Sequence, residues 1–190
     1  ELFKLWELKV GKKIILFPGR LTSWKGQEMF LDAINKVNIQ LGHDAFISVI
    51  LGSDQGRDLY KKKLIRLVEQ YRLNNQVKFI EHCKNMPVAY KISNFVVSAS
   101  TKPESFGRIS VEAQSMQKPI LASNIGGSKE TIIDNKTGIL FEVGNSEEMS
   151  KKIIELLNLD ESTINQMGIE GRKNVINKFN VEKMCFSTYS

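Results

Sequence analysis

The sequence predicts an α/β domain, a Rossmann-like parallel sheet with helices on both of its faces. Short apolar runs alternate with amphipathic stretches, and most of the runs are too apolar for a sheet with one face in water. Strands that alternate with helices pair in parallel, because each helix returns the chain to the same end of the sheet. No internal repeat or low-complexity linker divides the chain, so we expect one domain over residues 1–190.

The elements follow from the spacing of the apolar residues. The runs that predict strands lie, in order, at residues 14–17, 45–51, 77–80, 95–97, 119–122 and 138–141. Between and after them, apolar residues recur at the spacing of one helix face, which predicts helices over residues 30–41, 60–71, 109–116, 149–157 and 164–179. In such a sheet ligands bind beyond the carboxyl ends of the strands, so the loops after the strands are expected to carry the functional residues.

Composition and charge exclude several classes of protein. The chain has 27 Lys and Arg against 21 Asp and Glu, a net charge of +6, and it is 42% hydrophobic, which is typical of a globular domain and not of a collagen, coiled-coil, disordered or disulfide-rich chain. No run approaches the roughly 18 apolar residues of a membrane span, and no export signal opens the chain. We therefore expect a cytoplasmic protein.

Metal and nucleic-acid sites are not expected. Cys83 and Cys185 lie far apart and outside any C-x-x-C pair, which suits a reducing compartment and argues against zinc. His43 and His82 stand alone, and no D-x-D sequence is present. The basic excess lacks the bidentate arginine contacts of sequence-specific nucleic-acid readers, although a net positive field attracts anionic lipid or polyphosphate.

The loop after the first predicted strand reads Pro-Gly-Arg-Leu-Thr-Ser-Trp-Lys-Gly and opens the first long helix. Gly19 allows close backbone approach, and Thr22 or Ser23 is expected to cap the helix. Arg20 and Lys25 place two cations beside a helix N-terminus, a combination that suits a diphosphate. The loop is neither a Walker loop nor the G-x-G-x-x-G dinucleotide fingerprint.

The loop after the fourth predicted strand contains Glu104 and leads into a helix that carries Glu112. On a continuous helix, eight positions correspond to about 12 Å of rise and a rotation of about 80°. The pair therefore cannot flank one bond as the carboxyls of a glycosidase do, at about 5 to 10 Å. Two such acceptors suit separate parts of an elongated, hydroxyl-rich ligand such as a sugar and a ribose. The alternative is a capping glutamate and an unrelated surface glutamate.

In the next loop Gly126 and Gly127 indicate another close backbone approach. Together the motifs resemble the group 1 glycosyltransferases of the GT-B fold, over their C-terminal, donor-binding half from about Lys12 to the end. The matching segments are Pro18-Gly19-Arg20-Leu21 with Lys25-Gly26, Glu104-Ser-Phe-Gly with Glu112-Ala113, Gly126-Gly127 with Glu130, and Thr137-Gly138-Ile139-Leu140. The sequence departs from the family pattern at residues 114–117, where small residues and glycine are commoner.

The resemblance implies transfer of a sugar, with retention of configuration, from a UDP- or GDP-linked donor to an acceptor, without a metal or other cofactor. Arg20 and Lys25 would hold the diphosphate and stabilise the leaving group, and Glu104, the third residue assigned to catalysis, would meet the sugar hydroxyls. Glu112 would bind the ribose. Gly19, Phe106, Gly107 and Arg108 would also bind the donor. Residues 81–84 would lie near the base of the nucleotide.

The resemblance also implies a missing N-terminal half. Residues 1–11 are then a linker from that acceptor domain, and residues 179–190 are a tail that crosses back to it. The isolated nucleotide-sugar-binding domain is expected to bind nucleotide but hardly to turn over. The acceptor would be a sugar or a lipid-linked group, with peripheral contact at the inner face of the membrane.

Three other functions stay open at this stage. One is a non-catalytic nucleotide-binding module. Another is an epimerase or a phosphorylase on the same fold, because architecture does not fix the reaction. A nicotinamide-dependent oxidoreductase is the weakest alternative, since the glycine fingerprint is missing.

Overall fold

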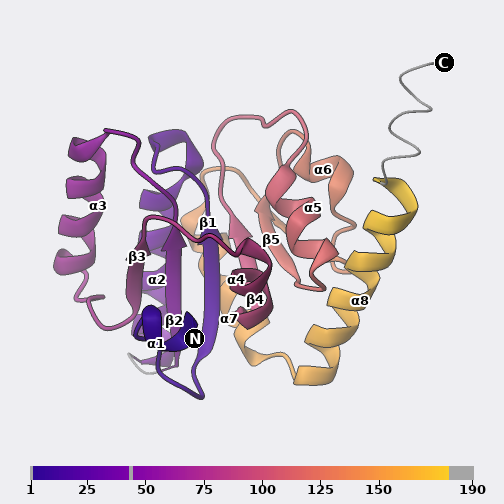
Figure 1. The fold of residues 1–190 in the computed structure, drawn as a ribbon, viewed down its shortest axis with the longest axis horizontal. Coiled ribbons are helices and arrows are strands. Elements are labelled where there is room, and N and C mark those ends of the chain that lie inside the picture. Colours follow the sequence, from indigo (N-terminus) through magenta and orange to yellow (C-terminus); the bar gives the residue numbers. More distant parts are fainter. Residues whose placement is uncertain (1, 43–44, 180–190) are drawn as a thin grey trace.

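The computed structural model describes residues 2–42 and 45–179 (Figure 1). Six strands form one sheet in the order β3-β2-β1-β4-β5-β6, and every neighbouring pair is parallel. The strands are β1 (Lys13–Pro18), β2 (Phe46–Leu51), β3 (Val77–Ile80), β4 (Phe95–Ser98), β5 (Ile120–Ser123) and β6 (Gly138–Phe141). The predicted parallel sheet is confirmed, and the strand order reverses between β1 and β4, where ligand crevices form in such sheets.

All five predicted helices are present, as α2 (Gln27–Leu41), α3 (Asp58–Gln70), α5 (Arg108–Ser115), α7 (Ser146–Asn158) and α8 (Glu161–Lys178). No residue range was predicted for three short helices: α1 (Leu2–Leu5), α4 (Met86–Ile92) and α6 (Ser128–Thr131). Each has seven residues or fewer, which is too short for an apolar stripe to repeat. Of the described residues, Ser23–Lys25 also form a 3₁₀ turn.

Three predicted helix starts were too late by three residues. Helices α2, α7 and α8 begin at Gln27, Ser146 and Glu161, whereas the apolar spacing begins at Phe30, Met149 and Ile164. The first turn of each helix is largely polar, so apolar periodicity does not detect it. In α8 the start is fixed by Asp160, whose side chain accepts a hydrogen bond from the backbone N–H of Thr163 at 2.9 Å.

The core consists of two apolar layers, one on each face of the sheet. Alternate residues of β1 serve the two layers: Ile15 and Phe17 face one, and Ile14 and Leu16 face the other. The first layer packs against α2, α3 and α7, with the rings of Phe17 and Phe30 4.9 Å apart. The second packs against α4 and α5. Helices therefore cover both faces, as predicted, and each fully buried large apolar side chain contributes about 1.5–3 kcal/mol.

The N-terminal segment packs on the domain. Trp6 and Leu8 are buried in the second apolar layer. Residues 2–8 therefore belong to the folded unit, and a connection from residues 1–11 to another domain stays a prediction. Of the predicted tail, residues 180–190 lie outside the described part of the chain.

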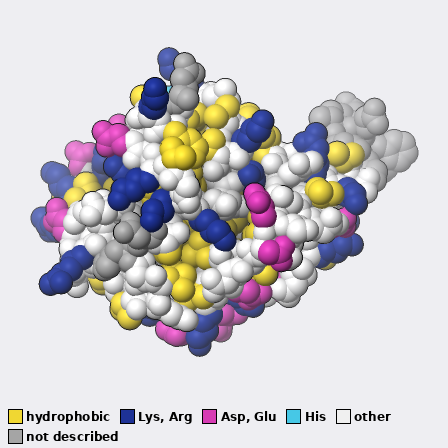
Figure 2. Space-filling model, turned by 90° about the horizontal axis from the view of Figure 1, so that it is seen from below, with side chains coloured by type: hydrophobic (Ala, Val, Ile, Leu, Met, Phe, Trp, Pro, Cys, Tyr) yellow, Lys and Arg dark blue, Asp and Glu magenta, His cyan; other side chains and the backbone are white. Residues whose placement is uncertain are grey.

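Figure 2 shows the molecule from below. Lysine and arginine side chains are spread over this face and its rim, among hydrophobic and acidic ones. On the described surface of this face the basic side chains form no continuous stripe. The basic side chains seen on this face are thus scattered.

Candidate functional site

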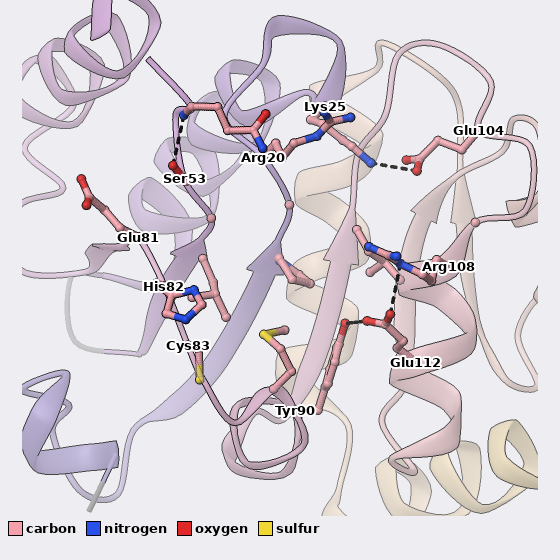
Figure 3. Close-up of a pocket in the computed structure, with 18 of the residues that line it drawn as sticks. Arg20, Lys25, Ser53, Glu81, His82, Cys83, Tyr90, Glu104, Arg108 and Glu112 are labelled. Carbon is pink, nitrogen blue, oxygen red and sulfur yellow. Dashed lines mark hydrogen bonds and ion pairs between the residues drawn. The ribbon is translucent and has the colours of Figure 1, made fainter. Parts of the chain in front are cut away.

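A pocket of about 700 Å³ opens at the carboxyl ends of β1, β2 and β3 and in front of α5. This volume is in the usual range of a small-molecule site. Figure 3 shows the side chains that reach into it from four loops and from α4 and α5. All eight residues that sequence analysis assigned to a site line this pocket: Gly19, Arg20, Lys25, Glu104, Phe106, Gly107, Arg108 and Glu112. Their individual roles stay predictions.

The backbone of the loop after β1 packs closely against the end of β2. Gly19 has a φ of +148°, and its N–H donates to the carbonyl of Leu51 at 2.8 Å. A Cβ atom on Gly52 would lie 2.0 Å from the carbonyl oxygen of Gly19, so only glycine fits there. This contact fixes the backbone from which Arg20 extends.

The predicted helix cap at Thr22 or Ser23 was wrong. The 3₁₀ turn comes first, and α2 begins after Gly26, which is its N-cap with a φ of +80°. A Cβ atom on Gly26 would lie 2.0 Å from the carbonyl oxygen of Ala99, so the backbone of this turn packs directly on the end of β4. Thr22 and Ser23 therefore precede α2 and do not cap it.

Lys25 and Glu104 form an ion pair at the rim of β1 and β4. Lys25 is buried, and its Nζ lies 2.8 Å from Oε2 of Glu104 (Figure 3). The hydroxyl of Ser100 donates to the other oxygen of Glu104. The ammonium also lies 4.6 Å from the ring centroid of Trp24, within reach of a cation–π contact. The side chain of this largely buried lysine is thereby held in place in the pocket.

Glu112 lies at the other end of the pocket, on α5. Its Oε2 accepts a hydrogen bond from the hydroxyl of Tyr90 at 2.7 Å, and its Oε1 lies 3.3 Å from Nε of Arg108. Burial and the charge of Glu112 raise the pKa of the Tyr90 phenol, so this hydroxyl stays protonated and donates. The second glutamate is therefore held by a neutral donor and a cation.

The two glutamates do not lie on one continuous helix. Helix α5 begins at Arg108, and Glu104 stands in the loop before it, so the helical rise of about 12 Å does not describe their separation. Glu104 faces Lys25 and Glu112 faces Tyr90 (Figure 3). That the two carboxylates bind separate parts of one ligand stays a prediction.

Two glycines of the loop after β5 position the loop after β4, which carries Glu104. The N–H of Gly127 donates to the carbonyl of Glu104 at 2.8 Å. A Cβ atom on Gly126 would lie 2.7 Å from that oxygen, and one on Gly127 would lie 2.4 Å from the carbonyl carbon of Phe106. The predicted close backbone approach at residues 126–127 is confirmed, and it supports the segment that carries Glu104.

Phe106 is partly exposed at the pocket rim. Its ring meets the ring of Phe179, after the end of α8, edge to face with centroids 5.7 Å apart. The adjacent Gly107 is the N-cap of α5, with a φ of +67° and no side-chain bond to the helix amides. The N-terminus of α5 thus faces the pocket with its first backbone N–H groups uncapped by a side chain.

The loop after β3 forms the wall opposite α5, with Glu81, His82 and Cys83 lining the pocket. Glu81 is paired with Lys61 of α3, whose ammonium also lies 3.8 Å from Asp54. The hydrogen bond that Lys61 donates to Glu81 is the main cause that raises the pKa of Lys61. Charge on this wall is therefore neutralised locally.

Sequence analysis missed three residues that hold the site together. Tyr90 and Ser100 bind the two glutamates, and the fully buried Gln27 donates from Nε2 to the carbonyl of Arg20 at 2.8 Å. Tyr60 donates to the other end of the same amide at 3.2 Å. Tyr90 lies in the unpredicted α4, 22 positions before its partner, so no local pattern could have linked them.

Within residues 2–42 and 45–179, no group of three or more histidine, cysteine, aspartate and glutamate side chains is arranged to hold a metal ion. In the same part of the chain, no helix is both long enough and apolar enough to cross a membrane.

Comparison with known proteins gives consistent matches. The family model described as glycosyl transferases group 1 matches residues 1–174. The capsular polysaccharide biosynthesis glycosyltransferase CapM of Staphylococcus aureus is 28% identical over 166 residues, which is 87% of this chain and 42% of CapM. The chain spans less than half the length of the first curated relatives that it matches.

Two solved structures share the fold. A glycosyltransferase from Rickettsia africae superposes with a TM-score of 0.92 at 30% identity, over 99% of this chain and 49% of that one. HepE from Anabaena, solved in complex with UDP and glucose, superposes with a TM-score of 0.88 at 25% identity, over 99% of this chain and 50% of that one.

Proposed function

The chain belongs to the group 1 glycosyl transferases, and we propose that it is the donor-binding half of an enzyme that transfers a sugar from a nucleoside diphosphate sugar to an acceptor with retention of configuration. Its fold is that of the C-terminal half of a GT-B glycosyltransferase. The observation that carries the proposal is the joint placement of Arg20, Lys25, Glu104 and Glu112 in one pocket at the switch point of the sheet.

The diphosphate is assigned to the end of the pocket with Arg20 and Lys25. When the bond between sugar and diphosphate breaks, negative charge builds on the leaving phosphate, and fixed cations in a partly buried site stabilise it. Lys25 is already held there by Glu104 and Trp24, so little reorganisation is needed. The uncapped N-terminus of α5 at Gly107 supplies further N–H donors for a phosphate.

The hydroxyl groups of the donor are assigned to the two carboxylates. Glu104 would accept from the transferred sugar and Glu112 from the ribose, through charge-assisted hydrogen bonds. Each carboxylate has lone pairs beyond those used by Ser100, Tyr90 and the neighbouring cations. The base would then lie against the loop that carries His82 and Cys83.

A related structure supports one choice of donor for this proposal. HepE was solved with UDP and with UDP-glucose, which supports a uridine nucleotide and a hexose here ahead of a guanosine nucleotide. We propose no metal or other cofactor, because Arg20, Lys25 and the α5 N-terminus already offer positive charge to the diphosphate.

In this proposal, the acceptor binds to a part of the enzyme that lies outside this chain. The chain covers about half of its full-length structural relatives, so an N-terminal half that binds a sugar or lipid-linked acceptor completes the enzyme. On its own the chain should bind donor with little turnover. We place the enzyme in the cytoplasm, in peripheral contact with the inner membrane face when the acceptor is lipid-linked.

Calorimetric titration of the chain with UDP, GDP, ADP and NAD tests the donor site. We expect saturable binding of one nucleoside diphosphate, weakened at least tenfold in Glu112→Ala and unchanged in the matched control Glu155→Ala, whose carboxylate pairs with Lys152 on α7. Binding of NAD in preference to the diphosphates, or no binding at all, would contradict the proposal. For the full-length enzyme, release of nucleoside diphosphate only with acceptor present would distinguish a transferase from an epimerase.

A further inference from the structure

Tyr90 connects two elements on opposite sides of the pocket floor. It lies on α4, which begins after the capping residue Asn85, and its side chain packs in the apolar layer beneath the site. The residue is only 2% exposed, yet its hydroxyl reaches the pocket and lies 2.7 Å from Oε2 of Glu112 on α5 (Figure 3). The ring is thus fixed by the core while the oxygen is presented to the site.

The contact has a fixed direction. Burial and the charge of Glu112 both raise the pKa of the phenol, so its proton stays on the oxygen and the carboxylate accepts. A hydrogen bond to an ionised acceptor is about twice as strong as one between neutral groups. Oε2 keeps a second lone pair, so Tyr90 does not exclude a ligand hydroxyl from the same oxygen.

Tyr90 is the rigid partner of Glu112. The side chain of Glu112 is 41% exposed, and that of Arg108 is 85% exposed, so the pair of these two residues is open to solvent and weakly restrained. The glutamate would sample several rotamers if it depended on Arg108 alone. The buried phenol selects one of them before any ligand arrives, and such preorganisation increases affinity.

We propose that Tyr90 is a positioning residue of the nucleotide site, whose hydroxyl holds the carboxylate of Glu112 in the orientation that the ribose hydroxyls require. This inference rests on the proposed function, because it assigns the ribose to Glu112. It adds that recognition of ribose depends on a residue of α4, a helix outside the loops that carry the family motifs.

The test is a titration of wild-type chain and Tyr90→Phe with UDP and with 2′,3′-dideoxy-UDP. Phenylalanine keeps the ring and its packing and removes only the hydroxyl. We expect Tyr90→Phe to weaken UDP about tenfold, the effect of one hydrogen bond to a charged group, and to change the affinity for the dideoxy nucleotide less than twofold. In a Glu112→Ala background the same substitution should have no further effect on UDP.

Tyr71→Phe is the matched control. The hydroxyl of Tyr71 is one of the groups that lower the pKa of a carboxyl, that of Asp32, and neither residue lines the pocket, so its removal should leave UDP binding unchanged. The calorimetric stoichiometry reports the folded fraction separately from the dissociation constant, so loss of folding cannot imitate loss of positioning.

Four results would overturn the proposal. Equal weakening of UDP and the dideoxy nucleotide would mean that Tyr90 supports the pocket in general. A tenfold effect that persists in Glu112→Ala would mean that Tyr90 acts without Glu112. Wild-type binding of UDP that Tyr90→Phe leaves unchanged would remove the role of Tyr90 and leave the proposed function intact, whereas a wild-type chain that binds neither UDP nor GDP would overturn both.

Discussion

Nζ of Lys25 lies 2.8 Å from Oε2 of Glu104, although the two residues come from loops that follow different strands, β1 and β4. These strands are neighbours in the sheet but are far apart along the chain. The ion pair therefore ties together the two loops that meet at the switch point. It also holds each residue where the proposed donor needs it, with the ammonium towards the diphosphate and the carboxylate towards the sugar.

Replacement of Lys25 by methionine should destabilise the chain. The substitution keeps the long side chain but leaves the partly buried Glu104 without its cation, which we expect to lower the free energy of unfolding by about 1–2 kcal/mol. Urea denaturation measures the change. In Lys25→Met with Glu104→Gln the loss should be smaller than the sum of the two single losses, because no unpaired charge remains. If the losses of unfolding free energy in the two single variants add up to that of the double variant, the ion pair contributes nothing to stability.

Replacement of Gly126 by alanine should damage the site through the backbone of Glu104. The new Cβ would lie 2.7 and 2.8 Å from the oxygen and nitrogen of Glu104, and the glycine has a φ of +55°. We expect a loss of about 3 kcal/mol in unfolding free energy, from left-handed strain and steric overlap together, and weaker binding of nucleoside diphosphate.

Gly144→Ala separates these two causes. Gly144 has a φ of +82°, but a Cβ atom there would meet nothing within 4 Å. Its substitution should lower the unfolding free energy by only about 1 kcal/mol, the effect of the left-handed backbone alone, and leave nucleotide binding unchanged. Urea denaturation measures both changes. Equal losses of unfolding free energy in Gly126→Ala and Gly144→Ala would show that the loop shifts enough to relieve the overlap with Glu104.

The sequence predicted the framework because its signals are local. The run Ile-Ile-Leu-Phe at residues 14–17 and the stripe in residues 30–41 each extend over enough residues to show a period. Helix α4, with seven residues, does not, and neither does the 3₁₀ turn at residues 23–25. Polar helix starts were likewise placed too late, since nothing apolar marks them.

The site was predictable at the positions where a loop motif carries chemistry. Arg20, Lys25 and Glu104 lie in loops after strand ends, and Glu112 lies on the helix that follows one of these loops. The strand order brings these segments together. Their partners were not predictable. Ser100, Tyr90 and Gln27 contribute ordinary hydroxyl and amide groups, and only the folded chain shows which group each one faces.

Gln114 should prove to be a stabilising residue of the core. This residue lies on α5 and is fully buried. Its Nε2 donates to the carbonyl of Thr131 at 2.8 Å, and its Oε1 accepts from Asn174 of α8 at 3.0 Å. Because Gln114→Ala leaves buried partners unsatisfied, we expect a loss of about 2–3 kcal/mol in the free energy of unfolding.

Thermal and urea denaturation of Gln114→Ala measure this loss, with Gln166→Ala as the control. Gln166 lies on the exposed side of α8, where its amide is 3.5 Å from Glu170, and its replacement should change stability by less than about 0.5 kcal/mol. If both variants unfold like the wild type, the amide network between α5 and α8 does not contribute to stability.

Asp32 should give the chain part of its resistance to acid. Partial burial opposes its ionisation, but hydrogen bonds from Lys36 and Ser146 and the charge of Lys36 outweigh burial, so the pKa of Asp32 lies below its ordinary value. A carboxyl whose pKa falls on folding stabilises the native state above its unfolded pKa, and that contribution is lost as the pH falls through the folded pKa.

Between about pH 5 and pH 2, Asp32→Asn should therefore lose less unfolding free energy than the wild type. The difference should be under about 1 kcal/mol, because the side chain of Asp32 is over a third exposed. Urea titrations across this range measure the difference, and Lys36→Met should show the same flattened profile. Parallel profiles for wild type and Asp32→Asn would mean that the carboxyl titrates alike in the folded and unfolded chain.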